Sequence, residues 1–154
     1  MLNSSPGELN ASKLSNALDK DFDSISNYLK YLEEAGVIRF IFPGNSGQAA
    51  LRNSIKMYPE NTNLIHAAYL PTAHDQIKGK IRETFLVNQL QNAEQSVFYS
   101  MVGDFKIDER IVEVGGKGKN KRQIKNEKNS YVLADDLIVG STGVIPLYLF
   151  GFLY

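Results

Sequence analysis

Carboxylates and lysines gather in the second half of the chain, in a pattern suited to chemistry on phosphate esters. Glu83 lies in the middle of a predicted helix, Asp104 opens one predicted strand, and Glu113 ends the next. Two carboxylates at the ends of adjacent strands can bind Mg²⁺ or Mn²⁺. A metal ion held there would polarise a phosphodiester and activate a water molecule. Lys117 and Lys119 follow at once, and either could orient that water or stabilise developing charge.

The residues around this cluster predict an α/β unit. The expected elements are a helix at 77–92, strands at 97–102, 105–107 and 110–114, a polar and basic helix at 121–128, a strand at 131–134, and a buried strand pair or docked tail at 144–154. Helix, three strands, helix and strand in this order favour a mixed sheet.

The first part of the chain predicts two helices and a hairpin. One helix carries a continuous apolar stripe at i, i+3, i+4 and i+7 spacing, formed by Ile25, Tyr28, Leu29 and Leu32. A shorter helix precedes it and ends near Asp19, and strands at 37–42 and 54–58 follow it. Helix, tight turn, helix and hairpin is typical of a winged helix-turn-helix. We therefore expect a winged-helix-like segment at 1–58, a linker at 59–75 with a short helix, and a second domain at 76–154.

Several motifs, taken in order, resemble known families. "RIVEVGGKGK", which follows "DFKID", is similar to the core of the PD-(D/E)XK nuclease superfamily. The whole chain resembles the C-terminal half of a prokaryotic AAA+-type ATPase family, through the motifs "ISNYLKYLEEAGVI", "IKMYPENTNLIHA", "KGKIRETFLVNQL" and "IPLYLFGFLY". The resemblance implies an α/β (α+β) fold, with a winged helix-turn-helix-like segment followed by a restriction-endonuclease-like α-β-β-β-α-β domain with a mixed sheet.

The resemblance also implies a set of site residues. They are Glu83, Asp104, Glu113, Lys117, Lys119 and Gln123, with Asp104 and Glu113 as the metal ligands. Members of the superfamily place the glutamate and the lysine two residues apart, on one face of a strand. Here Gly115 and Gly116 lie between Glu113 and the lysines, and two glycines predict a break or bulge. We therefore expect the lysines to be held away from the carboxylates.

Two segments are candidates for contact with nucleic acid. In the helix at 23–35 the candidate residues are Ser24, Asn27 and Lys30. In the segment 117–128, where six basic residues face one acid, they are Lys121, Arg122 and Lys125. A solvated surface helix is the alternative for that segment. Residues 1–36 carry six acids against three lysines, the wrong sign beside phosphates, so we favour a structural or protein-binding role for the helix.

The composition excludes several classes of function. Seventeen basic residues balance 17 acidic ones, which argues against a generic nucleic-acid binder. The lack of cysteine excludes disulfides and thiolate metal sites, and two histidines, His66 and His74, are too few for a multi-histidine site. Neither a GxxxxGK[ST] loop nor a basic signal-peptide start occurs. The apolar run 144–154 is shorter than the roughly 20 residues of a membrane span, so we expect the cytoplasm.

Three functions remain open. The first is a non-catalytic accessory region that couples its own upstream ATPase domain to a protein or DNA partner. ATP would then bind only through that domain, which this sequence does not contain. The second is a Mg²⁺- or Mn²⁺-dependent DNA nuclease that uses the carboxylate site. The third is a regulator that binds DNA through the winged-helix-like segment.

Overall fold

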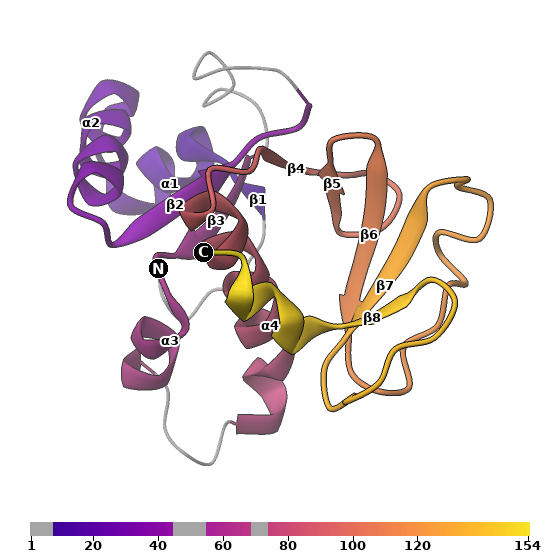
Figure 1. Cartoon of the computed structure of the whole chain (residues 1–154). Coiled ribbons are helices and arrows are strands. Elements are labelled where there is room, and N and C mark those ends of the chain that lie inside the picture. The colour runs from indigo at the N-terminus through magenta and orange to yellow at the C-terminus, as the bar shows by residue number, and fades with distance from the viewer. Residues whose placement is uncertain (1–7, 45–54, 69–73) are drawn as a thin grey trace.

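The computed structural model describes residues 8–44, 55–68 and 74–154 and shows a mixed α/β chain with two sheets (Figure 1). In chain order the elements are β1 (Glu8–Leu9), α1 (Ala11–Leu18), α2 (Phe22–Glu34), β2 (Ile38–Ile41), β3 (Ile55–Pro59), α3 (Thr62–Ala68), α4 (His74–Asn92), β4 (Val97–Tyr99), β5 (Phe105–Ile107), β6 (Arg110–Gly115), β7 (Ser130–Ala134), β8 (Val144–Pro146) and the 3₁₀-helix η3 (Leu147–Phe152). The helices predicted at residues 23–35, 63–69 and 77–92 are confirmed to within three residues at each end.

Polar side chains cap the two N-terminal helices. Asn10 caps α1 by accepting a hydrogen bond from the main-chain N–H of Lys13 (3.0 Å), and Asp21 caps α2 in the same way. Ile25, Leu29 and Leu32 of the predicted apolar stripe of α2 turn inward, to a core shared with β2 and β3, whereas Tyr28 is exposed and is not part of that core. After α2, Gly36 takes the left-handed conformation (φ 64°) that lets the chain turn into β2.

The smaller sheet has three strands in the order β1-β3-β2, all antiparallel. β3 is therefore its central strand, with Lys56 opposite Ile41 on β2. Side chains alternate between the faces of a strand, and the two faces of β3 enter different cores. Ile55 and Met57 pack with the N-terminal helices, whereas Tyr58 packs with residues of the second half.

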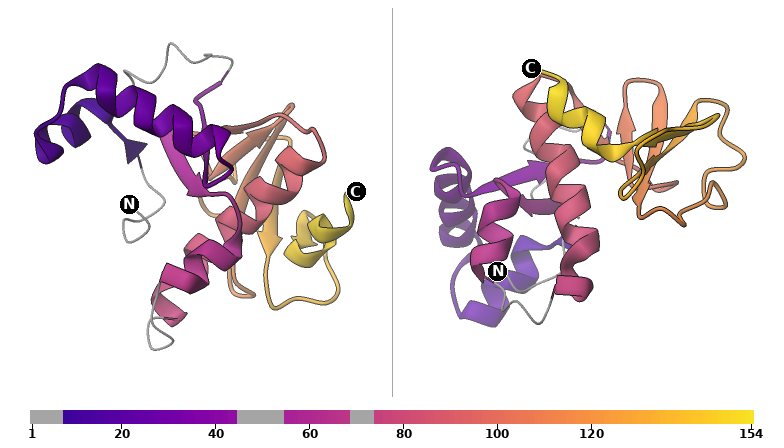
Figure 2. Two further views of the ribbon diagram at one scale, coloured as in Figure 1. Left: turned by 90° about the vertical axis from the view of Figure 1, so that its left-hand side faces the viewer. Right: turned by 60° about the horizontal axis from the view of Figure 1, so that its bottom comes forward.

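The larger sheet has five strands in the order β4-β5-β6-β7-β8. β4, β5 and β6 pair antiparallel, while β7 pairs parallel to both β6 and β8, so the sheet is mixed as expected. Helix α4 covers one face of this sheet and also contacts β3, and Figure 2 shows it running between the two sheets. The shared core contains Ile41, Tyr58, Leu86, Val87, Leu90, Phe105, Val112, Val114 and Leu133.

The helix predicted at 121–128 is wrong: the chain between β6 and β7 forms turns. This segment carries one apolar side chain, Ile124, which is fully buried under the sheet. One apolar residue cannot form the stripe that a packed helix requires. The Ser130 hydroxyl lies 3.0 and 2.9 Å from the carbonyl oxygens of Ile124 and Glu127, which ties the turns to the start of β7.

The C-terminal apolar run at 144–154 was expected to form either a buried strand pair or a docked tail, and it ends in a docked 3₁₀-helix. β8 joins the edge of the sheet, and η3 then packs against α4 (Figure 2). Of the helices in the described residues, none has both the length and the apolar character needed to cross a membrane.

Polar contacts also join the two halves. The Arg39 guanidinium on β2 forms an ion pair with Glu60 and donates to the side-chain oxygens of Gln91 (3.1 Å) and Asn92 (2.6 Å) on α4. The side-chain amide of Asn88 donates to the carbonyl oxygen of Glu60 at 2.8 Å. The small sheet is thus fixed against the helix that carries Glu83.

Candidate functional site

The carboxylate of Glu113 is the most deeply buried charge of the candidate site. The residue lies on the central part of β6 and is 1% exposed. The Lys119 ammonium forms an ion pair with one of its oxygens, and the side-chain amide of Gln123 donates to both, at 3.0 Å for Oε2. A buried carboxylate needs such partners, because an unpaired charge away from water is costly. The structure therefore brings together Glu113, Lys119 and Gln123.

The expectation that the two glycines separate lysine from carboxylate is wrong for Lys119. β6 ends at Gly115, and a tight turn follows in which the Lys119 N–H donates to the carbonyl oxygen of Gly116 at 2.8 Å. The side chain of Lys119 then passes back over Gly115. A Cβ atom at Gly115 would lie 2.6 to 2.8 Å from three carbons of that side chain, which is closer than real contacts allow. The glycine thus makes the ion pair with Glu113 sterically feasible.

Lys117 takes no part in this arrangement as the structure stands. Its side chain is exposed, whereas that of Lys119 is only one-third exposed (33%) and reaches Glu113. Of the two lysines that the sequence offers for the catalytic role, the structure places Lys119 at the carboxylate.

Asp104 lies immediately before β5 and forms hydrogen bonds with the main chain on both sides of Glu113. Its main-chain N–H donates to the carbonyl oxygen of Val112 (2.9 Å), and its carboxylate accepts a hydrogen bond from the N–H of Val114 (2.7 Å). Both partners are direct chain neighbours of Glu113. Gly103 precedes it with φ 76°, and a Cβ atom at this position would lie 2.9 to 3.0 Å from atoms of Ile111, Val112 and Ile124, so glycine is required here.

Glu83 joins the cluster from α4. Its carboxylate accepts a hydrogen bond from the Tyr58 hydroxyl at 2.8 Å. Burial raises the pKa of the Glu83 carboxyl above its ordinary value, and the negative charges of Asp104 and Glu113 raise it further. The Tyr58 hydrogen bond and the charge of Lys56 lower the same pKa. Three carboxylates from α4, the start of β5 and β6 therefore share one electrostatic environment.

Two residues of the site were missed from the sequence, and both come from β3. Tyr58 is fully buried, and burial followed by the charge of Glu83 raises the pKa of its phenol far above the ordinary range. Lys56 places its ammonium 5.5 Å from the ring centroid of Phe105 and 5.8 Å from that of Tyr99. Their spacing of two residues on a strand was the available signal, since it places both side chains on one face.

Asp104 and Glu113 are the two carboxylates from which a divalent cation site would have to be built. In the part of the chain that the structure describes, no group of three or more His, Cys, Asp or Glu side chains is arranged as a metal site. Mg²⁺, however, commonly uses one or two protein carboxylates and takes its other ligands from water and substrate phosphate. Asp104 and Glu113 are the candidates for such a pair, because Asp104 accepts a hydrogen bond from the residue that follows Glu113. Each ionised carboxylate has about four lone-pair positions, so the present hydrogen bonds leave capacity for a cation.

The nucleic-acid candidates on α2 divide into engaged and exposed residues. Ser24 is part of the helix cap, because its hydroxyl donates to Asp21 at 2.6 Å. Its role in contact with nucleic acid stays a prediction. Asn27 and Lys30 are exposed, and Lys30 pairs with Glu34 one turn later at 3.6 Å.

The basic segment between β6 and β7 divides in the same way. Lys121 donates to the carbonyl oxygen of Ser130 (3.2 Å), and its ammonium lies 6.0 Å from the ring centroid of Tyr131. It therefore stabilises the turn region. Arg122 and Lys125 are exposed and remain candidates for phosphate contact.

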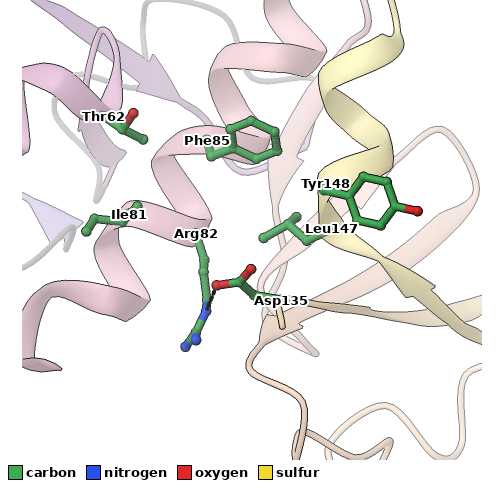
Figure 3. A pocket seen from close by; sticks show the side chains of 7 residues that line it. All are labelled: Thr62, Ile81, Arg82, Phe85, Asp135, Leu147 and Tyr148. Atoms are coloured by element: carbon green, nitrogen blue, oxygen red, sulfur yellow. Dashed lines mark hydrogen bonds and ion pairs between the residues drawn. The ribbon is translucent and has the colours of Figure 1, made fainter. Parts of the chain in front are cut away.

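Apart from the carboxylate cluster, a pocket of about 240 Å³ is lined mainly by residues of α4 and η3, including Arg82 (Figure 3). Its lining consists of Thr62, Ile81, Arg82, Phe85, Asp135, Leu147 and Tyr148. Arg82 points to Asp135 and forms an ion pair with it at 3.0 Å (Figure 3). The Asp135 N–H donates to the carbonyl oxygen of Gly115 at 2.8 Å, so this pocket adjoins the end of β6. Its walls are mainly apolar, in contrast to the carboxylate cluster.

Comparison of the chain with models of protein families, with curated proteins and with solved structures finds no match.

Proposed function

We propose that the chain is a divalent-metal-dependent nuclease domain that hydrolyses DNA phosphodiesters. The observation that supports this proposal is the buried Glu113 carboxylate paired with Lys119, with Asp104 bonded to the main chain on either side of it and Glu83 in the electrostatic field of both acids. The order of α4, three antiparallel strands and a parallel β7 supports the same assignment, because it agrees with a restriction-endonuclease-like core except at the missing second helix.

The roles follow from the position and charge of each side chain. Asp104 and Glu113 would hold Mg²⁺ or Mn²⁺, and the bound cation would polarise the phosphate and lower the pKa of a water ligand. Lys119, already at Glu113, would orient the attacking water and offset negative charge that develops on the phosphate. Hydrolysis joins the water oxygen to phosphorus and breaks one P–O ester bond, and the leaving oxygen takes up a proton.

The experiment is a cleavage assay on matched variants. Single-stranded, duplex and supercoiled DNA are incubated with the chain and Mn²⁺, and product is compared for Asp104→Ala and Lys119→Met. Each has a control on a nearby exposed residue, Asp108→Ala and Lys117→Met respectively. We expect both site variants to lose at least ~100-fold in rate, and both controls to retain activity. No cleavage of any DNA form by the unaltered chain would contradict the proposal.

A second proposal concerns the setting of this domain. We propose that it is the C-terminal region of a prokaryotic AAA+-type ATPase in the cytoplasm, with β1, α1, α2, β2 and β3 forming a winged-helix-like unit. The observation in favour is a group of exposed apolar side chains on and after η3, with Tyr148, Leu149, Phe152, Leu153 and Tyr154 between 44% and 77% exposed. Such groups on a folded surface often mark interfaces.

The ATPase proposal can be tested without the protein. The reading frame upstream of this sequence should encode a GxxxxGK[ST] phosphate loop on the same chain. A stop codon directly before Met1, with no such ATPase encoded upstream, would argue against this setting and leave the nuclease proposal unaffected.

A further inference from the structure

Lys56 and Tyr58 place a face of the N-terminal sheet at the carboxylate site. Both belong to β3, the central strand of that sheet, and β3 is held by pairing on both sides. Tyr58 contacts Glu83 directly at 2.8 Å, whereas the intervening Met57 packs into the N-terminal core. The position of this face is therefore fixed from both halves of the molecule.

The Lys56 ammonium is held beside the carboxylates without being neutralised by one of them. It lies over the rings of Phe105 and Tyr99, and Phe105 directly follows Asp104 in the chain. Its charge acts on Glu83. In the described residues, no carboxylate oxygen lies within the 4.0 Å that defines an ion pair with this ammonium.

The charge balance of the site indicates a use for this cation. Lys119 is already paired with the buried Glu113. A phosphate diester arriving at the proposed site of Asp104 and Glu113 would bring one more negative charge to a cluster of acids. A lysine ammonium beside a ring face keeps its charge and can donate to phosphate oxygens.

We propose that Lys56 binds the scissile phosphate of the substrate DNA, so that the N-terminal sheet completes the site of the second half. This inference rests on the proposed nuclease function and adds to it a residue from outside the nuclease-like core. Tyr58 acts as a positioning residue, since it reaches the site only through Glu83.

The test compares Lys56→Met and Lys56→Arg with Lys106→Met in the full 154-residue chain. Lys106 is a suitable control because it lies on β5, is 43% exposed, and pairs weakly with Glu109 at 4.0 Å. Each variant is titrated with Mn²⁺ by calorimetry. Cleavage of a labelled oligonucleotide is then measured at salt concentrations from about 50 to 200 mM, because contacts to phosphate weaken with salt over this range. Thermal melting confirms that each variant is folded.

For Lys56→Met we expect kcat/KM to fall about 30-fold, mostly through KM, and the salt slope to fall by about one. Mn²⁺ affinity should stay within about threefold of the unaltered chain. Lys56→Arg should keep most of the activity and the salt slope of the unaltered chain, because arginine also carries a positive charge. If Lys56→Met does not fold, cleavage and the salt slope are measured for Lys56→Arg in its place. If Lys56→Met cleaves DNA like Lys106→Met with an unchanged salt slope, the inference is wrong while the nuclease proposal stands. If the unaltered chain shows no Mn²⁺-dependent cleavage, both are overturned.

Discussion

Two of the lysine–glutamate ion pairs in the described residues share the same chemistry but lie in very different surroundings. Lys30 and Glu34 are one turn apart on α2, and their side chains are 58% and 59% exposed. Lys119 and Glu113 are six positions apart across a glycine turn, and the glutamate side chain is 2% exposed. An exposed helical pair contributes only a few tenths of a kcal/mol. A buried carboxylate, by contrast, depends on its partner, so the second pair indicates a site rather than a surface feature.

The largest effect should come from removing one lysine of each pair. Lys119→Met leaves a buried carboxylate without its cation, and we expect a loss of about 3 kcal/mol in the free energy of unfolding. Lys30→Met should cost less than about 0.5 kcal/mol. Urea denaturation of the two variants measures both values. Equal and small losses would contradict the dependence of the buried Glu113 carboxylate on Lys119.

A glycine substitution sharpens the comparison by blocking the path of Lys119. Gly115→Ala places a methyl group against that side chain and should cost about 2 kcal/mol. Gly118→Ala is the control, because a Cβ atom there meets nothing within 4 Å. Denaturation midpoints give the difference. If Gly115→Ala is as stable as Gly118→Ala, the ion pair does not take the path described.

The raised pKa of Glu83 predicts a pH-dependent change in stability. In the folded state this carboxyl binds its proton more tightly than in the unfolded chain, so its ionisation destabilises the fold at neutral pH. Glu83→Gln should therefore gain roughly 1 kcal/mol near pH 7. The gain should vanish as the pH falls below the ordinary carboxyl value of 4.5. Melting temperatures measured across this range test it, and a gain that persists under acid conditions would contradict the assigned cause.

The smallest effect concerns salt. At about 1 M salt the Debye length is about 3 Å, so exposed ion pairs are largely screened. The small cost of Lys30→Met should then disappear, whereas the larger cost of Lys119→Met should remain. The same denaturation experiments in high salt show this directly. A loss of the Lys119 effect in salt would place Glu113 in contact with solvent.

Local patterns predicted most of the helices and strands. The stripe that includes Ile25 and Leu29 predicted α2, because both side chains face the core. The helix at 121–128 was wrong because basic composition says nothing about packing, and Ile124 alone cannot form a stripe. The domain boundaries stay a prediction, although Ile41 and Tyr58 share a core with the second half.

The candidate site was predicted less completely than the fold. Residue type pointed to Asp104 and Glu113, but spacing argued against Lys119, because the reach of a lysine over a glycine turn is not visible in the sequence. Tyr58 reaches Glu83 from 25 positions earlier. Contacts of that kind depend on how the small sheet packs against α4, so no local sequence pattern predicts them.

The most direct test of the central claim is a calorimetric Mn²⁺ titration of the chain beside its Asp104→Ala and Asp108→Ala variants. The account predicts saturable binding of one cation by the unaltered chain and by Asp108→Ala, and loss of that binding in Asp104→Ala. No saturable binding by the unaltered chain, or equal binding by all three proteins, would contradict a metal site at Asp104 and Glu113.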